Sequence, residues 1–144
     1  MKPKDYFSPE QQNQIVEAIQ QAELNTSGEI RVHIDLTCKG EVLDCAAKTF
    51  AALKIHRTKL RNGVLFYLTI LDRKLAILGD AGINAHVPEN FWENIKLAMQ
   101  EKFQENNLTE GLVLGITLAG EQLKKFFPYK DNDVNELNDD ISFG

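Results

Sequence analysis

An eight-residue apolar run from Val64 to Leu71 limits the possible folds of this chain more than any other segment. Its residues favour β-structure and show no alternation of polar and apolar side chains. A strand of this kind is buried on both faces, which requires helices on both sides of its sheet. The polar break at Asp72-Arg73-Lys74 is too short for a helical crossover. A third strand, from about Lys74 to Leu78, should therefore return antiparallel as a hairpin.

Helical periodicity surrounds these strands. The segment Ser8-Pro9-Glu10-Gln11 is a capping box with proline at the first helical position, and it predicts a helix from about Ser8 to Glu23. From Glu29 the pattern changes to period two, which predicts a strand with one polar face. A second amphipathic helix lies between Val42 and Lys54. This helix should join the two strands by a right-handed parallel crossover.

Two more helices are predicted, one beginning at Pro88 and one from about Leu108 to Phe127. The elements together predict an α/β domain, residues 1–127, with a three-layer α/β/α sandwich and a small mixed sheet containing a parallel crossover and an antiparallel hairpin. Residues 128–144 are rich in Asp and Asn, and we expect a solvated acidic C-terminal tail that adds little stability. Within it, Asp131–Asn135 copies part of an EF-hand loop but lacks the later glycine and glutamate.

Composition narrows the class of protein. Apolar residues make up 43% and charged residues 26%, as in an ordinary soluble globular protein. The net charge of −5 argues against nucleic acid as a partner, because phosphate contacts need clustered Lys and Arg. No run is long enough to span a bilayer, so we expect no direct membrane insertion. Cys38 and Cys45 form no C-x-x-C motif and are expected to be free thiols in a cytoplasmic protein.

The predicted topology gathers four polar residues at one end of the sheet: Glu29, Arg61, Asn62 and Asp80. A glycine-rich loop, Gly79 to Gly82, lies beside them. Two carboxylates can hold a divalent cation, Ca²⁺ or Mg²⁺, so Glu29 and Asp80 are candidate metal ligands. Arg61 could orient a phosphate, with Asn62, Gly79 and Gly82 completing a binding site. The alternative is a structural salt bridge of Arg61 with Glu29 or Asp80. No standard catalytic motif is present, and no catalytic residue is assigned.

Four segments together are similar to the TPM domain family, over roughly Ser8 to Phe127. They are Ser27–Val32, Arg61–Leu65, Asp72–Lys74 and Gly79–Asn84. The resemblance implies an α/β/α sandwich with a mixed sheet and divalent-cation sites in acidic loops. It also implies weak acid-phosphatase activity in some members, and roles in the repair or assembly of membrane complexes.

Two functions are therefore expected as alternatives. The first is a protein-interaction module, an assembly or repair accessory whose partner belongs to a membrane complex. That module would use the loop Gly79–Pro88 or the acidic tail. The second is a weak metal-dependent acid phosphatase with Glu29 and Asp80 as cation ligands and Arg61 as the phosphate clamp.

Overall fold

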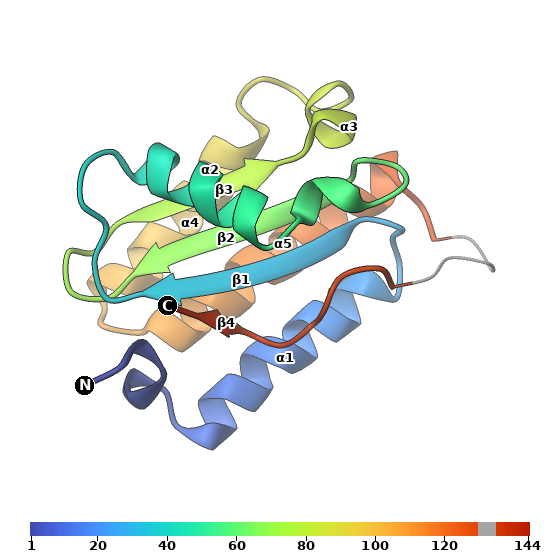
Figure 1. Cartoon of the computed structure of the whole chain (residues 1–144). Helices are drawn as coiled ribbons and strands as arrows, with labels where there is room; N and C mark the ends of the chain where they lie inside the picture. Colours follow the sequence, from blue (N-terminus) through green and yellow to red (C-terminus); the bar gives the residue numbers. More distant parts are fainter. Residues whose placement is uncertain (130–134) are drawn as a thin grey trace.

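A computed structural model describes residues 1–129 and 135–144 of the protein. A mixed sheet of four strands, in the order β3-β2-β1-β4, lies at the centre of the molecule (Figure 1). The strands are β1 (Glu29–Asp35), β2 (Gly63–Thr69), β3 (Leu75–Gly79) and β4 (Ser142–Phe143). The helices are α1 (Pro9–Glu23), α2 (Val42–Ala52), α3 (Ala81–Asn84), α4 (Phe91–Gln104) and α5 (Leu108–Phe126), with short 3-10 turns η1 (Pro3–Tyr6) and η2 (Ile55–Arg57).

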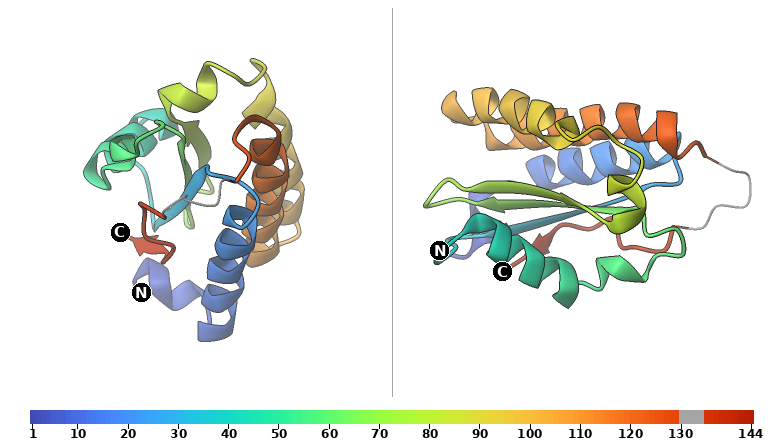
Figure 2. Two further views of the ribbon diagram at one scale, coloured as in Figure 1. Left: turned by 90° about the vertical axis from the view of Figure 1, so that its right-hand side faces the viewer. Right: turned by 90° about the horizontal axis from the view of Figure 1, so that it is seen from above.

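The helices form two layers, one on each face of the sheet. In the right-hand view of Figure 2, α1, α4 and α5 lie on one side of the strands, and α2 lies on the other. Strands β1 and β2 are parallel, and β2 and β3 are antiparallel. The predicted three-layer sandwich, with its parallel crossover and its hairpin, is confirmed.

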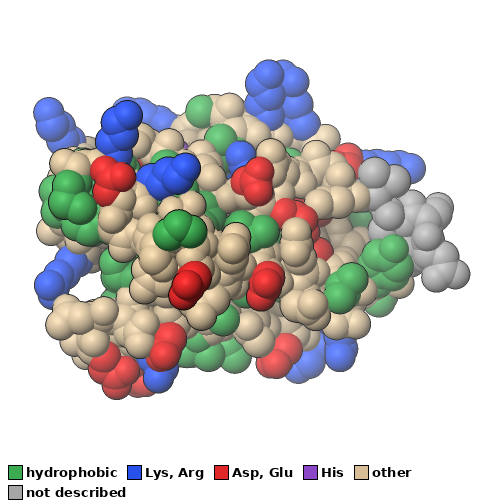
Figure 3. Space-filling model, turned by 90° about the horizontal axis from the view of Figure 1, so that it is seen from below, with side chains coloured by type: hydrophobic (Ala, Val, Ile, Leu, Met, Phe, Trp, Pro, Cys, Tyr) green, Lys and Arg blue, Asp and Glu red, His purple; other side chains and the backbone are tan. Residues whose placement is uncertain are grey.

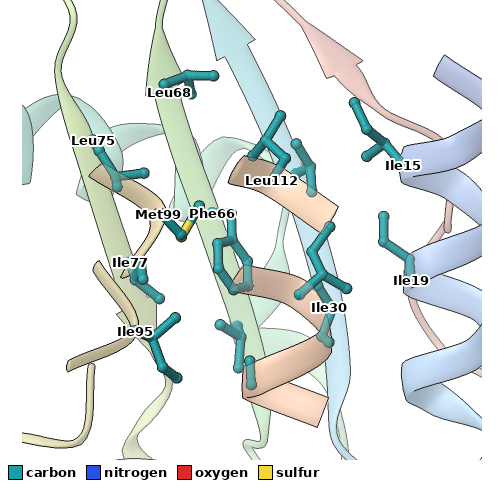
Figure 4. Packing of buried hydrophobic residues seen from close by; sticks show 14 of the residues in the cluster. Ile15, Ile19, Ile30, Phe66, Leu68, Leu75, Ile77, Ile95, Met99 and Leu112 are labelled. Atoms are coloured by element: carbon teal, nitrogen blue, oxygen red, sulfur yellow. The ribbon is translucent and has the colours of Figure 1, made fainter. Parts of the chain in front are cut away.

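The central strand β2 supplies core side chains to both layers. All seven of its residues are buried. Phe66 and Leu68 face the large cluster under α1, α4 and α5, which includes Ile19 and Met99 (Figure 4). Tyr67 faces the smaller cluster on the α2 side. Each fully buried side chain of this size contributes about 1.5–3 kcal/mol, so this strand is a large part of the driving force for folding.

The first helix begins as its sequence predicts. The backbone N–H of Gln11 donates to Ser8 Oγ at 3.1 Å, and the N–H of Ser8 donates to Gln11 Oε1 at 2.9 Å. Ile15 and Ile19 are fully buried against the sheet. The underside of the molecule in Figure 1, where α1 lies, carries carboxylates mixed with separate apolar groups (Figure 3).

The C-terminal segment differs from the prediction. Residues 130–134, which hold most of the EF-hand-like stretch Asp131–Asn135, lie outside the described residues. Ser142 and Phe143 form β4, which pairs parallel to β1 opposite His33 and Ile34. The expectation of a solvated tail is wrong for residues 135–144. They run along the outer edge of β1, whose unpaired backbone groups need partners.

Side chains also hold this segment to the domain. Arg31 Nη1 donates to the carbonyl oxygens of Asn138 and Asp140 at 2.9 and 2.7 Å. Ile141 and Phe143 are half-buried against the main core. The acidic composition favoured a solvated tail, and the alternation in Ile141-Ser142-Phe143 is too short to predict a strand by itself.

We expect the double substitution Ile141→Ser and Phe143→Ser to lower the free energy of unfolding by about 2 kcal/mol, because both side chains would lose apolar contacts. Urea denaturation measures this change. Leu71→Ser is a matched control, because Leu71 is 57% exposed and its replacement should be nearly neutral. Equal stability of the double variant and the wild type would show that the segment does not stabilise the domain.

Candidate functional site

The four polar residues predicted to share one end of the sheet do lie there. Glu29 is opposite Gly63 in the parallel register of β1 and β2. The N–H of Asp80 donates to the carbonyl of Gly63 at 2.9 Å, which places the residue after β3 at the same end. Arg61 and Asn62 directly precede β2. The topology inferred from the sequence therefore positioned this cluster correctly.

Arg61 and Asp80 form a two-pronged ion pair. Arg61 Nε lies 2.7 Å from Asp80 Oδ2, and Nη2 lies 2.8 Å from Oδ1. The N–H of Ala81 also donates to Asp80 Oδ1 at 2.7 Å. Burial alone raises the pKa of Asp80, but the hydrogen bonds from Arg61 and Ala81 outweigh it and hold the pKa below the usual value. The structural salt bridge, which was one of the two alternatives, is confirmed for this pair.

The glycine-rich segment beside this pair is helical and closely packed. Asp80 is the N-cap of α3, so the expected loop is instead the start of a short helix. A Cβ on Gly82 would lie 2.2 Å from the carbonyl oxygen of Leu60. A Cβ on Gly79 would lie 2.7 Å from Trp92 Cζ2. Both glycines are thus explained by close packing, and a ligand-binding role for them stays a prediction.

Asn62 connects the turns that lead into β1 and β2. It is buried, its Nδ2 donates to the carbonyl of Ser27 at 3.0 Å, and its own carbonyl accepts the N–H of Glu29 at 3.2 Å. The backbone N–H of Asn62 donates to Thr58 Oγ1 at 3.2 Å. These contacts use the groups that a ligand would need, so the binding role of Asn62 also stays a prediction.

Glu29 does not pair with Arg61. Its carboxylate binds the backbone of the C-terminal segment. Its Oε1 accepts the N–H of Leu137 at 2.7 Å and also the N–H of Glu136. Burial raises the pKa of Glu29, and these two hydrogen bonds counteract the increase. Among the described residues, no three His, Cys, Asp or Glu side chains form a group that could hold a metal ion. A shared cation between Glu29 and Asp80 remains untested.

Glu29 has two acidic neighbours that sequence reasoning missed. Glu23, Glu29 and Asp139 line one hollow of about 290 Å³. Glu23 Oε2 accepts the N–H of Ile30 at 2.9 Å. Burial, followed by the hydrogen bond to Asp139, raises the pKa of Glu23 to about 9, so its carboxyl is protonated at neutral pH. The sequence offered no signal for this contact, since Glu23 ends a helix and Asp139 lies in the acidic segment.

Cys38 and Cys45 form a disulfide, with their Cα atoms 6.2 Å apart. The prediction of free thiols is therefore wrong: the chain turns back at Gly40 into α2 and brings Cys45 over Cys38. Lys74 Nζ donates to the carbonyls of Cys38 and Gly40 at 2.7 and 2.9 Å. The cytoplasmic location, which depended on free thiols, loses that support and stays a prediction. In the described part of the chain, no helix is long and apolar enough to cross a membrane.

A hydrogen-bonded chain fastens β4 to β1. His33 Nδ1 lies 2.8 Å from Ser142 Oγ, and His33 Nε2 lies 2.8 Å from Asp35 Oδ1. Tyr67 Oη donates to Asp35 Oδ2 at 2.6 Å, and burial followed by this bond raises the pKa of Tyr67. These are the residue types of a serine-hydrolase relay, which also needs a substrate cleft beside the serine. None of these residues lines the hollow of about 290 Å³ beside Glu29, or a second concave site of about 460 Å³.

The larger of these two concave sites lies at the opposite end of the sheet, where β2 ends. This cleft, of about 460 Å³, lies between the β2–β3 hairpin, α4 and the start of α5. Two rim residues, Arg73 and Asn106, have left-handed backbone with φ of 53° and 60°. The lining comprises Leu68, Thr69, Ile70, Arg73, Leu75, Gln100, Phe103, Gln104, Asn106 and Leu108. Sequence reasoning placed Arg73 only in a turn and missed this cleft.

The raised pKa of Glu23 predicts a pH effect on stability. A carboxyl with a raised folded-state pKa stabilises the fold fully below its unfolded pKa of 4.5, and this contribution is lost as pH rises toward about 9. We expect Glu23→Gln, which mimics the protonated form, to flatten the decrease in melting temperature between these two pH values.

Thermal unfolding across this pH range measures the difference between the two proteins. Glu17→Gln, at an exposed position of the same helix, is the matched control and should leave the pH profile unchanged. Parallel profiles for the wild type and Glu23→Gln would show that Glu23 ionises normally in the folded protein.

Comparison with known proteins agrees with this architecture. The family model described as the TPM domain matches residues 1–122. The chain is similar to the BA42 protein from the psychrophilic bacterium Bizionia argentinensis, solved by NMR, with 45% identity, a TM-score of 0.93 and 99% coverage of both chains. No curated protein matches the chain significantly.

A more distant structure shares the fold. The N-terminal domain of a P. gingivalis protein has 21% identity and a TM-score of 0.66, over 81% of this chain and 75% of that one. The match of the family model to most of the chain, together with the BA42 structure, settles the classification. This chain belongs to the TPM domain family.

Proposed function

We propose that this TPM domain is a protein-interaction module, an accessory in the assembly or repair of a complex, and that it binds its partner in the cleft at the hairpin end. The observation that carries the proposal is the composition of this cleft. Its floor is apolar, its rim carries side-chain amides, and none of its lining residues is Asp, Glu, His, Cys or Lys. Such a surface offers apolar contact and hydrogen bonds without a general base or a carboxylate ligand for a metal.

The position of the cleft and the engagement of its one hydroxyl support the same function. In α/β sheets, ligands commonly bind at the carboxyl ends of the parallel strands, and this cleft lies where β2 ends. The one hydroxyl in its lining belongs to Thr69, which is buried and accepts the N–H of Lys74 at 2.8 Å.

The acid-phosphatase alternative has less support. It requires Arg61 to hold a phosphate, but both prongs of its guanidinium contact Asp80. Releasing Arg61 would leave the buried Asp80 carboxylate without its counter-ion, which is costly. A membrane-complex partner remains the expected class for the interaction module.

A divalent-cation site is a second candidate, and the contact between Glu23 and Asp139 favours it. Two carboxyl groups that share a proton can exchange that proton for Ca²⁺ or Mg²⁺, because the cation removes the same repulsion. Glu29 lines the same hollow, but its Oε1 already accepts the N–H groups of Glu136 and Leu137. A cation held by Glu23 and Asp139 would join the end of α1 to the C-terminal segment.

Site-specific photo-cross-linking tests the interaction module. We expect a photoreactive residue at Gln104, on the cleft rim, to form discrete cross-links to another protein in cells. The same residue at Lys48, exposed on α2 in the opposite layer, should not form them. Identical products from both positions, or none from Gln104, would show that the cleft does not bind a partner.

Calcium-dependent melting tests the second candidate. A cation that binds only the folded state stabilises it by about 2.7 kcal/mol at a hundredfold excess over Kd, so millimolar Ca²⁺ should raise the melting temperature. Asp139→Asn should abolish the increase, and Asp80→Asn should retain it. If Asp80→Asn abolishes it instead, the cation binds the predicted Glu29 and Asp80 pair. A wild type that does not respond has neither site.

A further inference from the structure

We propose that the cleft at the hairpin end recognises the free C-terminal carboxylate of a peptide whose last side chains are apolar. This inference rests on the proposed interaction function and names the chemistry of the partner. It combines three features: a guanidinium without an ion pair, the positive end of a long helix, and an apolar floor.

Arg73 supplies the guanidinium. It lines the cleft, and in the part of the chain that the structure describes it forms no ion pair. Its neighbour Asp72 is already engaged, since it accepts the N–H of Cys38 at 3.0 Å and lies 3.6 Å from Lys74 Nζ. A guanidinium binds a carboxylate through two parallel hydrogen bonds, which makes a planar carboxylate its best partner.

The start of α5 adds positive potential. Leu108 is both a lining residue and the first residue of this 19-residue helix. The side chain of Asn107 accepts the N–H of Glu110 at 3.3 Å. Among the described residues, the N–H groups of Leu108 and Thr109 have no acceptor. Free N–H groups and the helix dipole favour an anion at this end.

Two carboxylates near the start of α5, those of Glu105 and Glu110, share the ammonium of Lys102, at 3.8 and 4.0 Å. Neither of them lines the cleft, whose one charged lining residue is Arg73. The lining of the cleft therefore carries a single positive charge.

The rest of the lining selects a peptide over other anions. Leu68, Leu75 and Phe103 form an apolar floor suited to aliphatic side chains. A phosphate or nucleotide would bring several charges against this floor and would leave them poorly solvated. Gln100, Gln104 and Asn106 offer amide donors and acceptors at the rim, which match peptide groups. A fatty acid would satisfy Arg73 and the floor but would leave these amides without partners.

Fluorescence polarisation with the full chain tests the inference. The probe is a labelled pool of peptides whose last four positions are Val, Leu, Ile or Phe with a free C-terminal carboxylate, and the comparison is the same pool with a C-terminal amide. We expect the free-carboxylate pool to bind at least about tenfold more tightly, the effect of one strong charge-assisted contact.

Two variants test whether Arg73 is the residue that binds the peptide carboxylate. Arg73→Asn should remove the preference for the carboxylate, and Asn tolerates the left-handed backbone at this position, so the fold is kept. Arg57→Gln, at an exposed arginine of η2, is the matched control and should retain the preference.

Three results would overturn the inference: equal binding of both pools, no binding of either, or a preference that survives Arg73→Asn. Tight binding of octanoate in place of the peptides would also overturn it, because the occupant would then be a fatty acid. Photo-cross-linking from Gln104 tests the proposed interaction function independently of the peptides. If the cross-links form but the peptides do not bind, the cleft binds a protein partner by other means than a C-terminal carboxylate.

Discussion

Burial of β2 on both faces is the constraint on which the rest of the structure depends. A strand with seven buried residues cannot lie at a surface, so α1, α4 and α5 must cover one face and α2 the other. The same strand also determines where the polar side chains of the candidate sites lie. Apart from the hydrogen-bonded chain that includes Tyr67, polar groups accumulate beyond its ends, at Arg61 and Asn62 before it and at the hairpin and cleft after it. The two candidate sites are therefore at opposite ends of one strand.

At the end of the sheet where β2 begins, the same residue types that could bind a metal ion stabilise the fold. Glu29 and Asp80 are buried carboxylates, and a buried charge needs a partner or a proton. Asp80 has Arg61, while Glu29 has the backbone of Glu136 and Leu137. From the sequence, such residues cannot be distinguished from metal ligands, because both roles require carboxylates held close to other polar groups. Only the identity of the partner separates the two roles.

The elements predicted correctly are those whose signal is local. The capping box at Ser8, the apolar run of β2 and the change to period two at Glu29 each lie within a few residues, and each forms the expected element. Most of the misses depend on contacts between residues that are far apart in the sequence. Ser142 meets His33 across 109 positions, and the cleft joins a hairpin to a helix junction. The disulfide joins residues only seven positions apart, but its prediction required knowing that α2 folds back over the end of β1. The sequence-derived topology grouped the polar residues at the first end correctly, but not their partners.

The loop closed by the disulfide has a consequence for the oxidation state of the protein. Closing so short a loop stabilises the fold by roughly 2 kcal/mol in the chain-entropy account. The same loop is held independently by Lys74, which binds two of its carbonyls, and by Asp72, which accepts the N–H of Cys38. Reduction would therefore free two thiols without detaching the loop.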